Sequence, residues 1–179
     1  MDFNEWTLNA IREEGTCFSW MEELRFNWIP QVKSTISKIL EGYTLIIITD
    51  KDFKYFSEYV TTKINQLEKN RPFIPIYPLE ALFPHYTTLK DASELDFLLD
   101  MLDISFINGY IFWYIGCGNH KLYEYIEQDK TSLIWRLNQD IEGIFSLNKS
   151  DPLIDIKLIQ SFQLFEKALD AALIGDIEL

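Results

Sequence analysis

The segment TLIIITD, residues 44–50, decides the fold class. It is a continuous run of β-branched and aliphatic residues, which is typical of a strand covered on both faces of a parallel sheet. Three further short apolar runs predict strands: FIPIYP at 73–78, YIFWYIG at 110–116 and SLIWRL at 132–137. Pro75 cannot donate to a ladder, so the strand at 73–78 is expected near an edge. A fifth strand is expected near residues 142–147 or at the end of the chain.

Segments with helical spacing separate these runs. Val32, Ile36 and Ile39, for example, share one face of a helix. The predicted helices cover 3–13, 17–41 with a break before Pro30, 52–70 with Asp52 as the N-cap, 91–103, 119–129, a segment starting near Asp140, and the C-terminal region.

Alternation of strands and helices predicts a parallel sheet with helices on both faces. We therefore expect a single α/β domain over residues 1–179. Its core would be a three-layer, doubly wound sheet of about five parallel strands flanked by helices, with a long C-terminal helix.

The composition argues against several classes of function. A net charge of −12 leaves no broad basic surface, so direct binding to nucleic acid or to an anionic membrane is not expected. Cys17 and Cys117 have no metal-binding spacing, which favours a reducing cytoplasm. The first residues lack a signal-peptide pattern, and no apolar run is long enough to span a membrane.

Ligands of open parallel sheets bind beyond the carboxyl ends of the strands, so the loops there are the expected place for a ligand site. Asp50 and Asp52 follow the first strand and would repel a phosphate. Gly116, Gly118, Asn119 and His120 follow the third strand, and their backbone N–H groups could hold a small anion or a sugar phosphate. The alternative is a tight turn capped by Asn119, with Cys117 buried as a small apolar residue.

No convincing catalytic set is present. His85 and His120 belong to no triad-like or metal-binding motif, and activation of Cys117 by His120 would need a positive environment that this acidic chain does not suggest. The sequence therefore predicts no enzyme activity, no cofactor and no metal.

The C-terminal segment, DPLIDIKLIQSFQLFEKALDAALIGDIEL at 151–179, predicts a long helix that starts with Asp151 as N-cap and Pro152 in the first turn, and that stops at Gly175. One apolar stripe can cover a sheet. It consists of Ile154, Leu158, Phe162, Phe165, Leu169 and Leu173. A second row is also largely apolar, and a second subunit or a partner is expected to cover it; the alternative is a helix central to a monomer. This row consists of Leu153, Ile156, Gln160, Leu164, Ala168 and Ala171.

The stretch DPLIDIKLIQSFQLFEKAL at 151–169 resembles the C-terminal helix of the HobA family, regulators that bind the replication initiator DnaA. The early Trp6, TLIIITD, IFWYIG at 111–116 and SLIWRL occur in the same order as in that family. The resemblance covers nearly the whole chain, and its specificity lies in the co-linear order of these packing motifs.

The resemblance implies a sugar-isomerase-like (SIS) α/β fold similar to that of the regulator DiaA. It also implies a homotetramer, a dimer of dimers, that binds the N-terminal domain of DnaA and favours DnaA assembly at the replication origin. In DiaA a Leu-Phe pair late in the last helix contacts DnaA, and the matching positions here are Leu169 and Asp170. Because the aromatic residue is absent, Leu173 and Ile174 one turn later are candidate substitutes.

Two other functions remain open at this point. One is a phosphosugar-binding enzyme or sensor of the SIS type, with Gly116, Gly118, Asn119 and His120 around the ligand. The other is a plain structural subunit.

Overall fold

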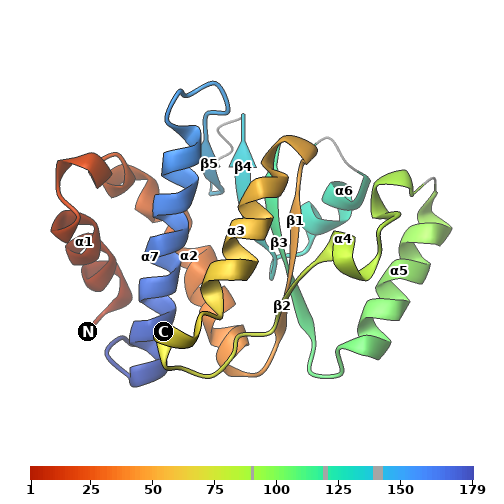
Figure 1. Cartoon of the computed structure of the whole chain (residues 1–179), viewed down its shortest axis with the longest axis horizontal. Helices are drawn as coiled ribbons and strands as arrows, with labels where there is room; N and C mark the ends of the chain where they lie inside the picture. The colour runs from red at the N-terminus through yellow and green to blue at the C-terminus, as the bar shows by residue number, and fades with distance from the viewer. Residues whose placement is uncertain (90, 119–120, 139–142) are drawn as a thin grey trace.

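The computed structural model describes residues 1–89, 91–118, 121–138 and 143–179. In this part of the chain five parallel strands form one sheet in the order β2-β1-β3-β4-β5 (Figure 1). The strands are β1 Thr44–Thr49, β2 Ile76–Pro78, β3 Tyr110–Gly116, β4 Leu133–Leu137 and β5 Phe145–Leu147. The predicted fold class is confirmed, β2 lies at an edge, and the fifth strand lies within 142–147.

The central strands are buried on both faces because their alternate residues enter two separate cores. In β1, Leu45 and Ile47 join one core, whereas Ile46 and Ile48 join the other. Trp113 and Phe112 of β3 divide in the same way. This two-sided burial is the reason why the strand sequences are continuous apolar runs rather than alternating ones.

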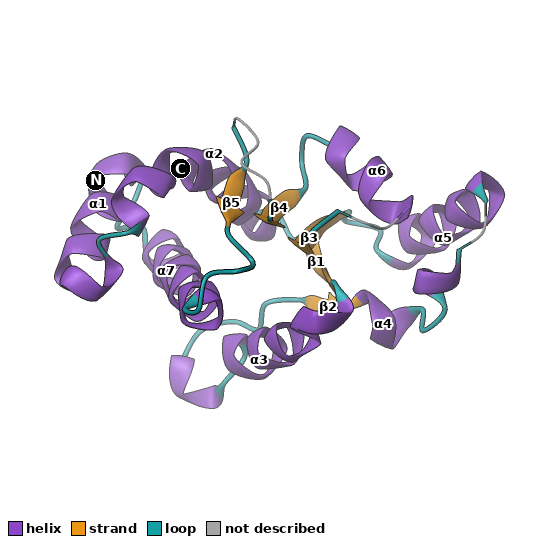
Figure 2. Cartoon of the chain, turned by 90° about the horizontal axis from the view of Figure 1, so that it is seen from above, coloured by secondary structure: helices purple, strands orange, loops and turns teal. Residues whose placement is uncertain are grey.

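Helices form a layer on each side of the sheet (Figure 2). One side carries α1 Phe3–Glu13, α2 Met21–Leu40, α3 Lys54–Ile64 and α7 Ile154–Ile174; the other carries α4 Leu79–Leu82, α5 Ala92–Ser105 and α6 Lys121–Gln128. Short 3-10 helices lie at Thr16–Phe18, Lys51–Phe53, Leu67–Lys69 and Tyr86–Thr88.

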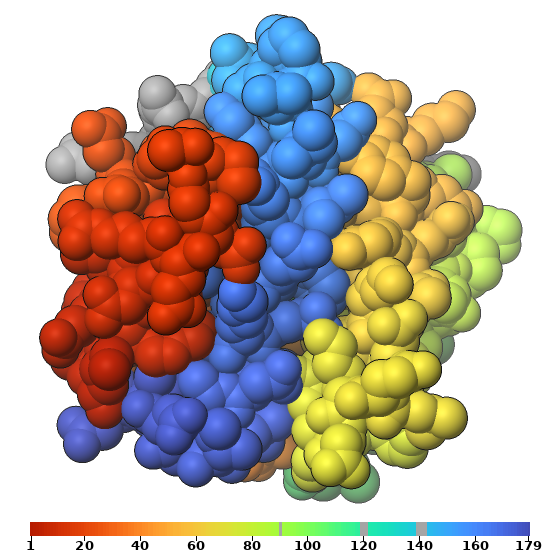
Figure 3. Space-filling model, turned by 60° about the vertical axis from the view of Figure 1, so that its left-hand side comes forward, coloured from red at the N-terminus to blue at the C-terminus, as the bar shows by residue number. Residues whose placement is uncertain are grey.

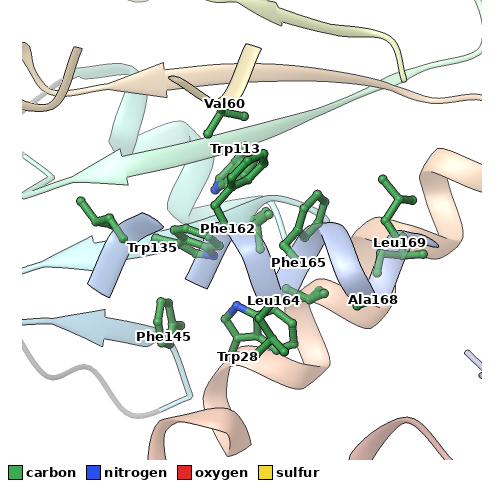
Figure 4. Packing of buried hydrophobic residues seen from close by; sticks show 14 of the residues in the cluster. Trp28, Val60, Trp113, Trp135, Phe145, Phe162, Leu164, Phe165, Ala168 and Leu169 are labelled. Carbon is green, nitrogen blue, oxygen red and sulfur yellow. The ribbon is translucent and has the colours of Figure 1, made fainter. Parts of the chain in front are cut away.

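The larger core centres on α7. Phe162 and Phe165 of α7 point at Trp113 of the central strand β3, with ring centroids 6.2 and 5.2 Å from that indole (Figure 4). Trp135 of β4 lies 4.9 Å from Trp113 and extends this aromatic cluster along the sheet. The predicted sheet-covering stripe of the last helix is thus buried from Ile154 to Leu169.

The second apolar row of α7 is covered mostly by its own chain, which corrects the expectation of a subunit or partner there. Leu164, Ala168 and Ala171 are buried beneath α1 and α2, and the small alanines permit close helix approach. Figure 3 shows α7 at the surface between α1 and the segment after α3. Only the start of the row, Leu153 and Ile156, remains 53% exposed. The sequence prediction failed because it did not anticipate that α1 would pack on the outer side of α7.

The predicted break before Pro30 is wrong, because α2 runs through this residue. Proline removes one backbone hydrogen bond from the helix interior. Here the adjacent turns carry Trp28, Ile29 and Val32, all buried in the core. Packing of these side chains holds the helix together across the missing bond.

Two predicted N-caps are also wrong. Asp52 lies within a 3-10 helix and forms an ion pair with Lys149 at 2.7 Å, and α3 begins two residues later. Asp151 accepts a 2.8 Å hydrogen bond from the backbone of Leu153 within a turn that precedes α7. The helix predicted near Asp140 starts outside the described residues, and the segment from 143 to the turn at 151 contains β5 instead.

Both ends of α1 and the C-terminal end of α7 lie where the sequence predicts them. Helix α1 has the predicted bounds, and Asp2 caps it by accepting from the backbone of Asn4 and Glu5. Gly175 ends α7 in the left-handed conformation, with φ of 80°. Helix α3, in contrast, stops at Ile64 rather than near residue 70.

Candidate functional site

A cleft lies at the carboxyl ends of β1 and β3, where parallel sheets of this kind bind ligands. The chain passes from β1 outward to β2 and then returns to β3 on the other side of β1, so this is the point where the strand order reverses. The cavity has a volume of about 490 Å³. Asp50, Lys51, Lys54, Glu80, Tyr86 and Tyr114 contribute its polar groups.

The Asp50 carboxylate accepts hydrogen bonds from groups that could otherwise bind an anion. It accepts 2.7 Å hydrogen bonds from the Cys117 backbone N–H and from the Tyr114 hydroxyl. The Gly118 backbone N–H donates to the Tyr114 hydroxyl at 2.8 Å. The backbone donors of residues 117 and 118 are therefore satisfied within the protein, and a phosphate placed there would meet a carboxylate.

The glycines of this loop are explained by the same contacts. A Cβ atom at Gly116 would collide with the Asp50 carboxylate and the Tyr114 hydroxyl. Gly118 has φ of 78° and lies against the Arg136 guanidinium, which leaves no room for a side chain. Both glycines allow close packing against the protein's own side chains. Asn119 and His120, the other two residues of this candidate loop, lie outside the described residues.

The candidate residues at the end of α7 lie in four different environments. Leu169 is fully buried, and Leu173 is partly buried against the core. Asp170 forms an ion pair with Arg71. Ile174 alone among them presents a large apolar side chain to solvent, at 74% exposure. The four positions therefore do not form one apolar patch on this chain.

A family model described as "HobA: DNA replication regulator" matches residues 1–179. The chain belongs to the HobA family. The DNA replication regulator protein HobA of Helicobacter pylori is 25% identical over 184 residues, covering 99% of both chains. The resemblance noted in the sequence is thus confirmed.

Two solved HobA structures from Helicobacter pylori share the fold. One is a HobA–DnaA (domain I-II) complex, with a TM-score of 0.76 and 26% identity over 100% of this chain and 99% of that one. The other is a crystal structure of HobA, with a TM-score of 0.74 and 24% identity over 100% of both chains. The likeness extends over the full length of this chain, so it includes both the five-stranded sheet and the long C-terminal helix.

Two features are absent from the described part of this HobA chain. No three His, Cys, Asp or Glu side chains gather there in an arrangement that could hold a metal ion. None of its helices is long and apolar enough to cross a membrane.

Sequence reasoning missed an exposed apolar face on α5. Phe97, Met101 and Ile104 are 62%, 40% and 79% exposed, although the helix is anchored to the sheet by Leu98 and Leu102. The signal was present in the sequence, because SELDFLLDMLDIS, residues 93–105, carries apolar residues on both sides of a helix. In a helix that covers a sheet, only one of these sides can be buried.

Cys117 is expected to react slowly with thiol reagents. Burial, and secondly the charge of Asp50, raise the pKa of its thiol, so the thiolate needed for attack is scarce at neutral pH. Cys17 is exposed. With Ellman's reagent at pH 7.5 we expect one rapid thiol and a second that reacts at least ~10-fold more slowly and speeds up as the pH rises towards 9 and above.

Cys17→Ser and Cys117→Ser assign the two phases, since each variant keeps only one of them. A rapid phase that survives in Cys17→Ser, with a rate independent of pH, would instead indicate a Cys117 thiolate stabilised by a nearby cation. That result would revive a nucleophilic role for this loop.

Proposed function

We propose that this protein is a non-enzymatic adaptor that acts in the cytoplasm, binds the N-terminal domain of the initiator DnaA and promotes DnaA assembly at the replication origin. The observation that carries this proposal is the likeness, over the full chain, to a HobA chain solved in complex with DnaA domains I and II. Membership of a family of DNA replication regulators supports the same role.

The contacts within the strand-end cleft support the proposed absence of enzymatic activity. The Asp50 carboxylate satisfies the Cys117 N–H and the Tyr114 hydroxyl, so the groups suited to a phosphosugar are already engaged. Burial and the hydrogen bond to Asp50 also raise the pKa of Tyr114, which keeps its hydroxyl protonated as a donor to this carboxylate. These contacts favour a structural role for the cleft over an SIS-type ligand site.

The adaptor is proposed to act as a homotetramer built as a dimer of dimers. Several DnaA-binding surfaces on one particle raise the local concentration of DnaA, and such linkage can increase avidity by about 10²–10⁴ without any new contact. A single chain could bind DnaA but could not gather several copies of it.

We expect light scattering of the purified protein to give a molar mass four times the 21.2 kDa of one chain. We also expect the protein to bind a DnaA fragment comprising domains I and II. Isothermal titration calorimetry gives affinity and stoichiometry, with the DnaA fragment lacking domain I as the control. Sugar phosphates at millimolar concentration should leave the melting temperature unchanged, because a ligand specific for the native state would raise it. A stable monomer, no DnaA binding, or a rise in melting temperature with one sugar phosphate would each contradict a part of this proposal.

A further inference from the structure

Helix α5 is anchored along one side only. Of its fourteen residues, Leu98 and Leu102 are buried. Phe97, Met101 and Ile104 are spaced by four and three residues, which places them in a row along the helix, on a side next to that of Leu98 and Leu102. We call this row the α5 ridge. Its exposed side chains are large, and Ile107 just beyond the helix is 92% exposed. Exposed apolar rows of this kind mark interaction sites.

A groove of about 500 Å³ adjoins the start of the ridge. Phe83, Leu89 and Phe97 supply its apolar walls, and His85 and Glu94 supply polar groups at its margin. Phe97 therefore belongs to both the groove and the ridge. Interfaces draw most of their binding energy from a few side chains inserted into such pockets, so the groove could receive an anchor from a partner.

An acidic row runs beside the ridge. Asp96, Asp100 and Asp103 follow the same four-and-three spacing, and the sequence of α5 contains no Lys or Arg. Among the residues that the structure describes, no Lys or Arg forms an ion pair with these three carboxylates. A second copy of the same helix would bring like charges together across the contact, which disfavours self-association here. An apolar surface flanked by Lys or Arg is complementary.

We propose that the α5 ridge and its groove are the docking surface for the DnaA N-terminal domain, which would present apolar side chains bordered by Lys or Arg. This inference rests on the proposed function. The end of α7 is less suitable, because Leu169 is buried and Asp170 is already paired with Arg71. The ridge offers three exposed apolar side chains, whereas the candidate residues at the end of α7 offer Ile174.

The apolar part of the proposal is tested with the full chain carrying Phe97→Ser and Ile104→Ser together. We expect affinity for the DnaA domain I–II fragment to fall at least ~30-fold, since two central apolar contacts each contribute more than about 1 kcal/mol. The melting temperature and light-scattering mass should remain those of the wild type. The matched control changes Leu67→Ser and Phe73→Ser, which are 84% and 72% exposed on another surface, and should leave affinity unchanged.

The electrostatic part is tested with Asp96→Lys and Asp100→Lys together. We expect the association rate constant to fall about tenfold at low salt, with the difference shrinking as salt is added. Glu5→Lys and Glu13→Lys on α1 make the same change in net charge at the other end of the molecule (Figure 1) and should have little effect. Equal effects of both pairs would show that only the net charge matters.

The outcomes separate the two proposals. If the wild type binds DnaA and both α5 variants bind equally well, the α5 inference is overturned while the adaptor function stands. If an α5 variant loses binding only together with a smaller light-scattering mass, the ridge is an interface between copies of the chain and the inference is wrong. If the wild type does not bind the DnaA fragment, both proposals fail.

Discussion

Replacing Phe162 by Ala is expected to lower the free energy of unfolding by about 3–5 kcal/mol, the usual cost of removing a buried aromatic ring. Phe162 is fully buried between α3 and the sheet. Its ring contacts those of Phe56, Tyr59 and Trp113 at centroid distances of 6.4, 5.8 and 6.2 Å. Truncation would leave a cavity bounded by three large rings, and rigid aromatic neighbours cannot easily collapse into it.

Urea unfolding followed by tryptophan fluorescence measures this loss, because Trp113 lies beside the altered site. The protein concentration must be held constant, since the stability of the proposed tetramer would depend on it. Phe73→Ala is the matched control: the ring is 72% exposed, and we expect a change of about 0.5 kcal/mol or less. A Phe162→Ala variant no less stable than the control would mean that α7 does not anchor the core.

Local patterns were sufficient to predict most of the fold. Thr44–Thr49 and Tyr110–Gly116 are buried on both faces, and continuous apolar runs report that burial directly. The three-residue strand β5 was placed only within a range, because Phe145–Leu147 is too short to show a period. Pro30 misled the prediction because the packing of the surrounding turns, which a local rule cannot see, outweighs one missing hydrogen bond.

The site was harder to predict because it depends on contacts between distant segments. Asp50 and Cys117 are 67 residues apart, and only the parallel pairing of β1 with β3 brings the carboxylate onto the loop N–H. The sequence predicted carboxylates at this edge of the sheet, and the structure places that of Asp50 there. The sequence could not indicate that this carboxylate bonds to the candidate loop itself. The distribution of apolar faces in α7 and α5 likewise depends on which helix packs outside which.

The contacts of Asp170 also change how the end of α7 should be probed. Arg71 lies 7% exposed between α3 and α7, where it contacts Glu166 at 3.3 Å and forms an ion pair with Asp170. It also donates to the Ile64 carbonyl at 2.6 Å, at the end of α3. Asp170→Lys would therefore place a cation beside Arg71 and reduce stability, whatever its effect on DnaA. A loss of DnaA binding in that variant must therefore be interpreted together with its melting temperature.

Arg71→Leu is expected to cost about 3 kcal/mol of unfolding free energy, because it leaves the 8% exposed Glu166 carboxylate without its buried partner. The estimate lies at the low end for a broken buried pair, since Lys69 still contacts Glu166 at 3.2 Å. Arg71→Leu with Glu166→Leu should recover most of the loss, because two apolar side chains need no desolvation of charge. Lys54→Leu removes an exposed pair with Glu80 and should cost under about 1 kcal/mol. The midpoints of urea unfolding measure the stability of all three variants, provided that the dependence of the unfolding free energy on urea concentration is the same in each. If the double variant were as unstable as Arg71→Leu alone, the cost would come from the lost Ile64 hydrogen bond and packing, and not from an unpaired Glu166.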